Sequence, residues 1–287
     1  MPEGDTVFTI AAFLRGELKD RTLVSGHVRS TAGTRPRRAG EPVRPPGQVD
    51  DLSGRTVRDV YSHGKHLFVA FDDVTLVRSH LGMHGSWHAY APGEAWRRPA
   101  QQASIVLHTG ERVYVCFNAS AVERLAAHGT RLHEIADRIG PDLVGPYDEA
   151  QILRRVDRFS DRGTPLVDLL LDQRIASGIG NVYKSEVLFI ERLNPSIGRG
   201  DLDAPQILAL YHCAATLLGR NIGGGPRVTR PNGDGAGRYW VYRRRAQPCL
   251  VCDTPIEQAL LGRDRRSTYW CPACQPSRRI SARGHNG

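Results

Sequence analysis

Four cysteines near the carboxyl end constrain the fold of this chain more than any other feature. They form two pairs of identical spacing, Cys249-x2-Cys252 and Cys271-x2-Cys274, separated by eighteen residues. Two chelating pairs of thiolates suit a closed tetrahedral zinc site, and the intervening length suits a β-hairpin that returns the second pair to the first. The spacing predicts one structural Zn2+. A redox CxxC is the alternative, which the doubled pattern disfavours. Because four protein ligands leave no open position, we expect this zinc to stabilise a finger without catalysing a reaction.

The amino-terminal residues and the other cysteines bear on the cellular compartment. The chain opens MPEGDT, which is acidic where a signal peptide is basic and then apolar. It has no apolar run near the roughly 18 residues that cross a bilayer. We therefore expect a cytoplasmic protein without a membrane partner, and we expect its cysteines to be metal ligands or free thiols. Cys116 and Cys213 are the expected core thiols.

The positive charge is concentrated at the carboxyl end. Residues 220–287 contain 13 Arg, no Lys and four acidic residues, so they account for the whole net charge of +9 and the first 219 residues are neutral. Clustered arginines neutralise phosphates and release counterions, which favours a polyanionic partner. An arginine-rich proteome is the alternative explanation, because the chain has 36 Arg and three Lys. Charge by itself leaves both explanations open.

The first half of the sequence predicts one helix and then strands. Apolar residues at positions 7, 10, 11, 14 and 18 share one helical face, and Asp5 or Thr6 is the expected cap. Residues 29–50 are rich in Pro, Gly and Arg and predict a loop. Two hairpins of a β-sandwich or barrel should follow, with strands at 66–71, 74–78, 104–108 and 112–117.

The pattern changes from strands to helices near Ile139-Gly140-Pro141-Asp142, where we expect a domain boundary. Residues 222–237 hold six Gly and two Pro and predict a mobile loop, and the tail after Gln275 should be disordered. Pro195 is expected to end the third of four helices, which fall at 148–159, 165–173, 182–192 and 205–221.

A glycine turn, Gly178-Ile179-Gly180-Asn181, joins two of these helices. Glycines at a helix start let the backbone approach a phosphate, whose charge the helix dipole favours, and Asn181 adds a donor. Taken alone, the turn is more typical of an ordinary tight connection. The longer string from Leu171 to Phe189, LDQRIASGIGNVYKSEVLF, closely resembles the helix–two-turn–helix of the Fpg/Nei DNA glycosylases. That family's pattern is LLDQ followed by GIGN, Y, a variable residue and E.

Matches at both ends of the chain extend this resemblance. The start, Met1-Pro2-Glu3-Gly4, resembles the family's catalytic N-terminus, and residues 266–275 resemble its zinc-finger signature. His63-Gly64-Lys65 lies where the family carries a catalytic-domain lysine. The resemblance covers residues 2–275 and is nearest the endonuclease VIII (Nei) branch.

The resemblance implies an α+β multidomain fold: an N-terminal β-sandwich with flanking helices, a C-terminal helical helix–two-turn–helix domain, and a four-cysteine zinc-finger β-hairpin. DNA would lie in the cleft between the first two. The expected boundaries are 1–135 for the catalytic domain, 136–147 for a linker, 148–242 for the helical DNA-binding domain, 243–275 for the finger and 276–287 for the tail.

The resemblance also implies a monomeric base-excision-repair enzyme. It would remove oxidised bases and cleave abasic sites by β,δ-elimination, and its partner would be double-stranded DNA containing damaged bases or abasic sites. After Met1 is removed, Pro2 offers a secondary amine with a pKa of about 8, which suits a nucleophile near neutrality. Glu3 is the implied proton shuttle. Without the other motifs, Pro2-Glu3 would be a routine start.

The remaining implied site residues contact DNA. Lys65, Asn181 and Arg266 should grip the phosphates around an everted nucleotide, together with the turn glycines Gly178 and Gly180. Taken singly, Lys65 and Arg266 are more typical of solvated surface charges.

A further motif concerns the gap that a flipped base leaves. The string from His80 to Gly85, HLGMHG, resembles the Fpg loop whose methionine fills that gap, so Met83 is the expected wedge. A core position between strands is the alternative for Met83. The segments 4–6 and 116–120 resemble the Nei branch instead, so the lesion preference stays open. Residues 222–237 are the candidate cover for the base.

Two other classes of protein share part of this pattern. A non-catalytic DNA-binding protein of the same fold would keep the finger and the basic surface, yet it would not need Pro2 and Glu3. A ribosomal or tRNA-associated zinc-ribbon protein would be basic, yet it would not need the two-turn motif. Incubation with an abasic-site duplex separates these classes from a lyase, because neither should nick it.

Overall fold

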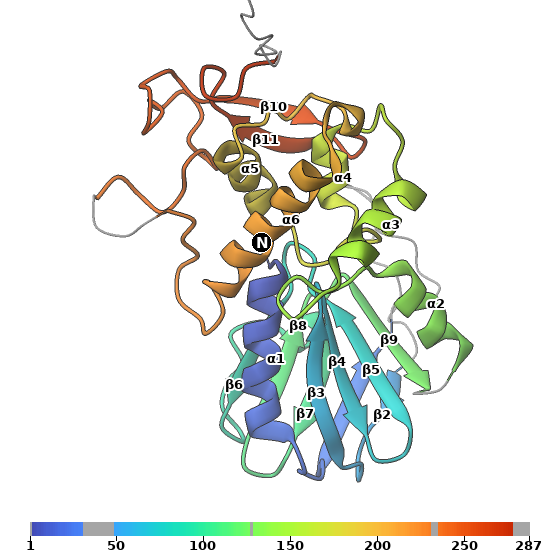
Figure 1. The fold of residues 1–287 in the computed structure, drawn as a ribbon. Coiled ribbons are helices and arrows are strands. Elements are labelled where there is room, and N and C mark those ends of the chain that lie inside the picture. The colour runs from blue at the N-terminus through green and yellow to red at the C-terminus, as the bar shows by residue number, and fades with distance from the viewer. Residues whose placement is uncertain (1, 31–48, 127–128, 231–234, 278–287) are drawn as a thin grey trace, which may run out of the picture. The chain divides into compact units, whose positions relative to one another are not determined.

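The computed structural model describes residues 2–30, 49–126, 129–230 and 235–277 (Figure 1). The chain divides into two compact units, Met1–Ile139 and Gly140–Gly287. Most of the predicted loop at 29–50, part of the loop predicted at 222–237 and most of the tail lie outside the described residues. Among the described residues, no helix combines the length and apolar character that a membrane span requires.

Unit 1 begins with helix α1, Gly4–Leu18, which packs along a neighbouring strand, β3 (Figure 1). Its predicted apolar face is confirmed, because the side chains at positions 7, 11, 14 and 18 are buried and that of position 10 is half-buried. The predicted cap was wrong. Glu3 is the N-cap residue, with φ −120° and no side-chain capping hydrogen bond, and Asp5 lies inside the first turn. An acidic residue is favourable anywhere in the first turn of a helix. The acidic residues therefore indicated where the helix begins, but not which residue is its N-cap.

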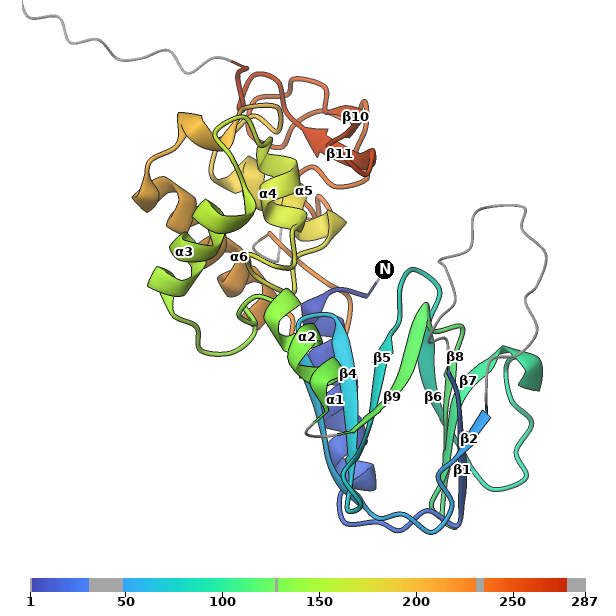
Figure 2. The same cartoon turned by 90° about the vertical axis from the view of Figure 1, so that its right-hand side faces the viewer.

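Two antiparallel sheets complete unit 1 and share one buried cluster with α1. Figure 2 shows the two layers edge-on. The four-stranded sheet has the order β3 (Val57–His63), β4 (His66–Phe71), β5 (Thr75–His80), β9 (Ala121–Ala126). The five-stranded sheet has the order β2 (Val49–Asp51), β1 (Ser25–Arg29), β7 (Ala103–His108), β8 (Val113–Phe117), β6 (Ser86–Tyr90). Both predicted hairpins are confirmed, and they belong to a sandwich.

Flanking helices were expected on the sandwich, but the positions of two short helical segments of unit 1 were not predicted. Helix α2, Thr130–Arg138, follows β9, and a 3-10 turn, Ala100–Gln102, precedes β7. The apolar residue Ile135 of α2 is buried against the outer face of the four-stranded sheet. Leu132, Ile135 and Ile139 fall at helical spacing and join one cluster, so the signal for this helix was present in the sequence and was overlooked.

Unit 2 is helical and ends in a hairpin. Its elements are α3 (Glu149–Phe159), α4 (Leu166–Leu171), α5 (Asn181–Ile190), a 3-10 turn (Arg199–Asp201), α6 (Ala204–Gly219), β10 (Glu257–Leu261) and β11 (Arg266–Trp270). Asp148 caps α3 by accepting the N–H of Ala150, and Asp203 forms a capping box with Gln206 on α6. The four predicted helices are confirmed within a few residues, and so is the hairpin between the cysteine pairs.

The end of α5 differs from the prediction. The helix ends at Ile190, before Pro195 is reached. Arg192 adopts φ +54°, and the N–H of Leu193 donates to the carbonyl of Leu188 at 2.9 Å. This arrangement is a C-terminal cap in which a left-handed residue reverses the chain. The cap ends the helix, and the proline follows it.

Candidate functional site

The first described residues of the chain lead directly into α1. Pro2 is half-buried, and Glu3 is buried with no exposed surface. The carbonyl of Glu3 accepts the N–H of Val7 at 3.1 Å, which is the first hydrogen bond of the helix. A rigid helix start therefore fixes the backbone at Glu3 and the position of the residue before it.

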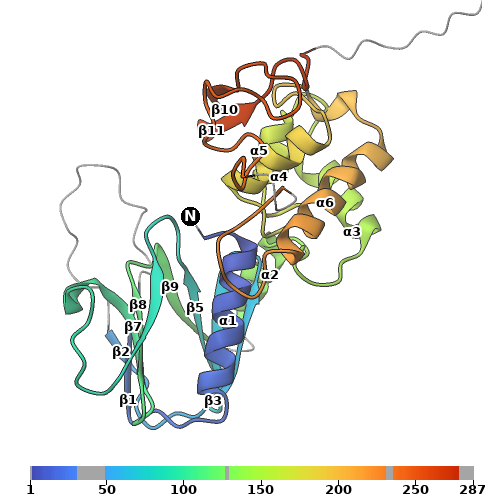
Figure 3. The same ribbon diagram turned by 90° about the vertical axis from the view of Figure 1, so that its left-hand side faces the viewer.

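Strand register brings two of the predicted site residues to one end of the four-stranded sheet. His66 at the start of β4 pairs with His80 at the end of β5. The turn carrying Lys65 and the connection carrying Met83 consequently leave the sheet at the same end. The start of α1 lies at this end as well in all three views (Figures 1, 2 and 3). The turn before β4, the connection after β5 and the start of α1 therefore lie at the same end of unit 1.

Met83 is an exposed residue, which rules out the core alternative. Its side chain is 61% exposed in the connection between β5 and β6. The connection is tight, because Gly82 has φ +62° and a Cβ there would lie 2.7 Å from the Cβ of Ser120. A Cβ at Gly85 would collide with the carbonyl of Leu81. Both glycines are therefore needed to present Met83 on this turn.

Two histidines lie beneath this connection and stay neutral. Burial lowers the pKa of His66 to about 2 and that of His80 to about 4, and the positive charges of Lys65 and Arg78 act in the same direction. The N–H of Gly82 donates to Nδ1 of His80 at 3.1 Å. A neutral His80 with its proton on Nε2 is the form that can accept this bond. The positive charge in this region is therefore carried by Lys65 and Arg78.

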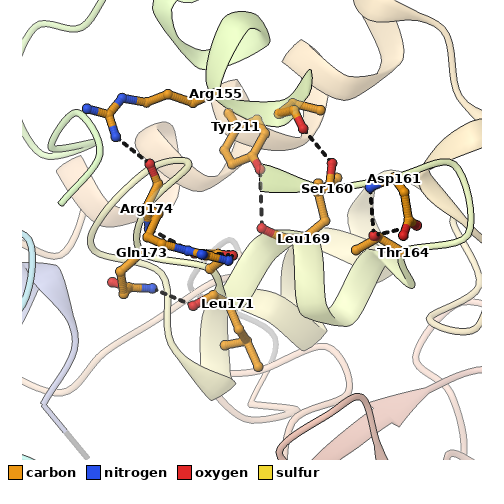
Figure 4. Close-up of polar contacts among 11 residues, drawn as sticks. Arg155, Ser160, Asp161, Thr164, Leu169, Leu171, Gln173, Arg174 and Tyr211 are labelled. Atoms are coloured by element: carbon orange, nitrogen blue, oxygen red, sulfur yellow. Dashed lines mark hydrogen bonds and ion pairs between the residues drawn. The ribbon is translucent and has the colours of Figure 1, made fainter. Parts of the chain in front are cut away.

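The glycine turn of unit 2 is held from inside by Gln173. Its amide nitrogen donates to the carbonyls of Leu171 and Ile179 at 2.9 and 3.0 Å. Figure 4 shows the first of these contacts. The amide oxygen accepts the N–H of Gly178 at 3.1 Å. Gly178 adopts φ +113°, which only glycine takes without strain, and Gly180 is the N-cap residue of α5. The turn therefore presents the positive end of the α5 dipole.

Asn181 and Arg266 come together where α5 meets β11. The Asn181 side chain is 9% exposed, and its nitrogen donates to the backbone and side-chain oxygens of Ser267 at 2.9 and 3.0 Å. Arg266 precedes Ser267 and is exposed. The Asn181 amide is thus already engaged inside the protein. To bind Asn181, a phosphate oxygen would have to share one of the two N–H groups with a Ser267 oxygen or displace that oxygen from it, which the sequence did not reveal.

Glu186 is a further polar residue that the sequence reasoning did not single out. It is buried on α5 with no exposed surface, and its carboxylate accepts the N–H groups of Trp240, Val241 and Tyr242 at 2.8 to 2.9 Å. The hydroxyl of Thr229 donates to the same carboxylate. Burial raises the pKa of Glu186, and these donors oppose that shift. Glu186 is the final E of the two-turn string, which was the available signal.

The four cysteines converge at the base of the hairpin. Their sulfur atoms all lie within 4.8 Å of one another. The Sγ–Sγ distances are 3.9 Å for Cys249–Cys274 and 3.4 Å for both Cys252–Cys271 and Cys252–Cys274. A tetrahedral ion with metal–sulfur bonds of about 2.3 Å would separate its ligands by roughly 3.8 Å. The cluster fits a metal ion with four thiolate ligands.

Polar contacts at its base and at its tip attach the cysteine finger to the helices of unit 2. Gln275 is fully buried, and its amide donates to the carbonyl of Leu193 at 2.8 Å and accepts the N–H of Cys271 at 2.9 Å. At the hairpin tip, the N–H of Arg263 donates to the carboxylate of Asp168 at 2.9 and 3.1 Å. The finger is therefore anchored at its base and at its tip. The other two cysteines, Cys116 and Cys213, lie outside the cluster.

Comparison with known proteins gives a consistent result over most of the chain. Residues 1–121 match the family model described as formamidopyrimidine-DNA glycosylase N-terminal domain, and residues 139–230 match the formamidopyrimidine-DNA glycosylase H2TH domain. The probable endonuclease 8 2 of Streptomyces coelicolor is 37% identical, covering 96% of this chain and 94% of the relative. The DNA-(apurinic or apyrimidinic site) lyase Nei2 of Mycolicibacterium smegmatis is 36% identical, covering 96% of this chain and 99% of the relative.

Solved structures share the fold at lower identity. The MutM (Fpg) protein from Thermus thermophilus has a TM-score of 0.71 and 25% identity, covering 96% of this chain and 98% of that one. The Lactococcus lactis formamidopyrimidine-DNA glycosylase, bound non-covalently to DNA containing an AP site, has a TM-score of 0.73 and 19% identity. That match covers 96% of this chain and 99% of the other. The sandwich, the helical unit and the cysteine finger expected from the sequence agree with this fold.

Proposed function

The chain belongs to the Fpg/Nei family of DNA glycosylases, and we propose that it is a bifunctional base-excision-repair enzyme that uses the amine of Pro2. It excises oxidised bases from double-stranded DNA and cleaves the resulting abasic site. The observation that carries this proposal is the Pro2-Glu3 pair at the head of α1, in a chain 37% identical to a probable endonuclease 8. Similarity to two endonuclease 8-type relatives favours the Nei branch.

Pro2 is the nucleophile in this proposal. Removal of Met1 exposes a secondary amine, and with a pKa of about 8 part of it is unprotonated near neutrality. The nitrogen lone pair attacks the sugar C1′ and the base departs with its bonding pair. The nitrogen then loses its proton, and the C1′–O4′ bond breaks as the ring oxygen takes up a proton, which leaves an iminium with no N–H proton to lose. This cation acidifies the C2′–H. Loss of that proton expels the 3′ phosphate, a second elimination expels the 5′ phosphate, and water then hydrolyses the iminium and releases the amine.

Glu3 and Lys65 assist this chemistry in different ways. Glu3 moves the proton that the departing base or the sugar ring oxygen requires. Its complete burial supports this role, because a carboxylate shielded from water interacts strongly with developing charge. Lys65 carries a positive charge at the same end of the sheet and contacts a phosphate of the everted nucleotide. Met83 fills the space that the everted base leaves.

Unit 2 contributes the phosphate-binding turn and the metal. Gly178, Gly180 and Asn181 at the start of α5, together with Arg266, contact the DNA backbone. The four thiolates hold one Zn2+, the metal that a closed four-cysteine site of this spacing favours, and its role is to stabilise the hairpin that carries Arg266. The protein acts as a monomer in the bacterial cytoplasm, where chromosomal DNA lies. The finer boundaries 148–242 for the helical domain and 243–275 for the finger belong to this proposal.

Borohydride trapping tests the nucleophile directly. The zinc-loaded protein is incubated with an abasic-site duplex or an oxidised-base duplex in borohydride, which reduces the iminium to a stable amine. We expect a covalent protein–DNA adduct that maps to residue 2. A matched protein with Met1 retained, or with an uncleaved N-terminal tag, should bind DNA but form no adduct, because an amide nitrogen has no available lone pair.

Two results would contradict the proposal in different ways. An adduct at Lys65 would preserve lyase chemistry and assign it to another nucleophile. Absence of any adduct on an abasic site and on a panel of oxidised bases, with the N-terminus correctly processed, would leave a non-catalytic DNA-binding protein of the same fold. The same lesion panel identifies the preferred base.

A further inference from the structure

Lys184 is a lysine on α5 with no exposed surface. Its ammonium donates to the side-chain oxygen of Asn181 at 2.7 Å, to the hydroxyl of Thr268 at 2.7 Å and to the carbonyl of Ser267 at 3.1 Å. These acceptors come from α5 and β11, which lie side by side within unit 2 (Figures 1 and 3). A cation in this position is costly to bury unless its hydrogen bonds are satisfied, so the three contacts hold the helix and the hairpin together.

The ammonium sets the orientation of Asn181. A lysine side chain can only donate, so it requires the amide oxygen of Asn181 to face inward. The NH2 group must then point the other way, toward Ser267, where it makes its two contacts. Without the ammonium, only the Ser267 carbonyl, which must accept a hydrogen bond, would still favour this orientation, and the inward-facing amide oxygen would lose its donor. Lys184 therefore reinforces, from the oxygen side of the amide, the orientation in which Asn181 turns its NH2 group toward Ser267.

The same ammonium fixes the start of β11. The hydroxyl of Thr268 accepts from Lys184 and donates to the carbonyl of Arg266 at 3.1 Å. The chain of contacts thus runs from Lys184 through Thr268 to the backbone of the exposed arginine. The contact from Lys184 to the Ser267 carbonyl holds Ser267, which lies between Arg266 and Thr268.

The residue type fits this role. Only three of the 39 Lys and Arg residues in the chain are lysine, and one of them occupies this buried position. An ammonium is compact and directs three donors to separate acceptors, whereas a guanidinium is planar and directs its donors in a fixed fork. Converging oxygens from an amide, a hydroxyl and a carbonyl suit the first geometry.

We propose that Lys184 is the positioning residue for the DNA-phosphate contacts of unit 2, acting through Asn181 and through the start of β11 at Arg266. This inference rests on the proposed function, in which Asn181 and Arg266 contact phosphates. It adds Lys184, which lies between Tyr183 and Glu186 of the two-turn string, to the binding machinery, as a group that does not itself touch DNA.

Equilibrium binding to a duplex containing a tetrahydrofuran abasic-site analogue tests the proposal. Lys184→Met, which keeps the length and removes the donors, should raise Kd on the order of ten-fold, because charge-assisted hydrogen bonds no longer orient two phosphate ligands. Lys19→Met, at an exposed lysine beyond α1, is the matched control and should leave Kd unchanged. Zinc content should stay at that of the unaltered protein in both variants.

A double-mutant cycle separates positioning from general stability. If Lys184 acts through Asn181, Lys184→Met should cost much less affinity in an Asn181→Ala background than in the unaltered protein. Full additivity of the two effects, or an unchanged Kd in Lys184→Met, would overturn the proposal.

Should Lys184→Met fail to fold or lose zinc, Thr268→Val decides the question. It keeps the ammonium and removes only the hydroxyl link to Arg266, so it should raise Kd several-fold, and much less in an Arg266→Ala background. An unchanged Kd in Thr268→Val, or full additivity with Arg266→Ala, would then overturn the proposal. Failure of the unaltered protein to form a borohydride adduct would count against the proposed catalysis alone, since binding is measured independently.

Discussion

Glu3 and Arg266 are an acidic and a basic residue that differ in their exposure to solvent. Glu3 has no exposed surface at the head of α1, whereas Arg266 is exposed at the start of β11. A substitution at Glu3 must therefore conserve shape if it is to report on chemistry, because truncation would open a cavity. Arg266 can be truncated to alanine without disturbing a core.

Glu3→Gln should separate the two proposed activities. Base removal needs proton transfer and should fall on the order of a hundred-fold or more. An abasic site already presents an aldehyde in equilibrium with the closed sugar, so its cleavage should fall much less. Single-turnover rates on an oxidised-base duplex and on an abasic-site duplex measure the two steps. Equal loss of both would argue against a glycosylase-specific role for Glu3.

Arg266→Ala should weaken DNA binding and base excision while the thermal unfolding curve stays unchanged. If the guanidinium neutralises one phosphate, the slope of log Kd against log salt concentration should shrink by roughly one unit. Arg58→Ala, at an exposed arginine on β3, is the control and should keep the original slope. If Arg266→Ala leaves both the salt slope of DNA binding and the rate of base excision unchanged, Arg266 is an ordinary solvated charge that does not contact DNA.

At the scale of elements, the pairing of β4 with β5 places two buried imidazoles side by side. The rings of His66 and His80 have centroids 4.9 Å apart, and burial lowers the pKa of both. Each stays neutral in the folded protein and takes up a proton after unfolding once the pH is below about 6.5. Acid therefore favours the unfolded state of this sheet.

Unit 1 should have its full stability above a pH of about 6.5 and lose stability as the pH falls toward about 4, the folded-state pKa of His80. Thermal unfolding at neutral pH and at a pH between these two values should show a lower melting temperature in the more acidic buffer. His80→Asn, whose amide oxygen can still accept the N–H of Gly82, should reduce this pH dependence. If the variant and the unaltered protein show the same pH dependence, protonation of His80 does not contribute to the loss of stability in acid.

At the scale of the molecule, the largest buried cluster of each unit is formed by residues of that unit alone. The cluster of unit 1 is formed by α1 and the two sheets, and that of unit 2 by its helices. A smaller cluster of unit 2 contains Phe189 of α5 and two of the cysteines, Cys249 and Cys271. Loss of the metal should therefore affect unit 2 directly and leave the core of unit 1 intact.

Cys271→Ser should lower finger stability and DNA affinity together, because the metal supports the hairpin that carries Arg266. Metal analysis, thermal unfolding and duplex binding measure the three quantities on one preparation. Cys213→Ser, at a half-buried thiol outside the cluster, is the control and should retain the metal. Purified protein that holds no stoichiometric zinc and has full activity would refute the structural role of the metal.

Local patterns determined much of this protein. Helical spacing predicted α1 and the helices of unit 2, alternation around short turns predicted β4–β5 and β7–β8, and paired spacing predicted the cysteine cluster. These features depend on residues close in sequence, whose periodicity reflects which face is buried. The family, too, was evident from short strings at the start, middle and end of the chain.

Tertiary structure decided the features that need partners distant in sequence. Strand register alone brings Lys65 and Met83 to one end of a sheet, and packing of α5 on β11 alone makes Lys184 a buried donor that joins Asn181 to Thr268. A lysine at this spacing on a helix looks locally like any solvated charge. The reason is physical: burial and hydrogen-bond orientation are set by the groups that surround a side chain, and the β11 groups around this lysine lie more than eighty residues away along the chain.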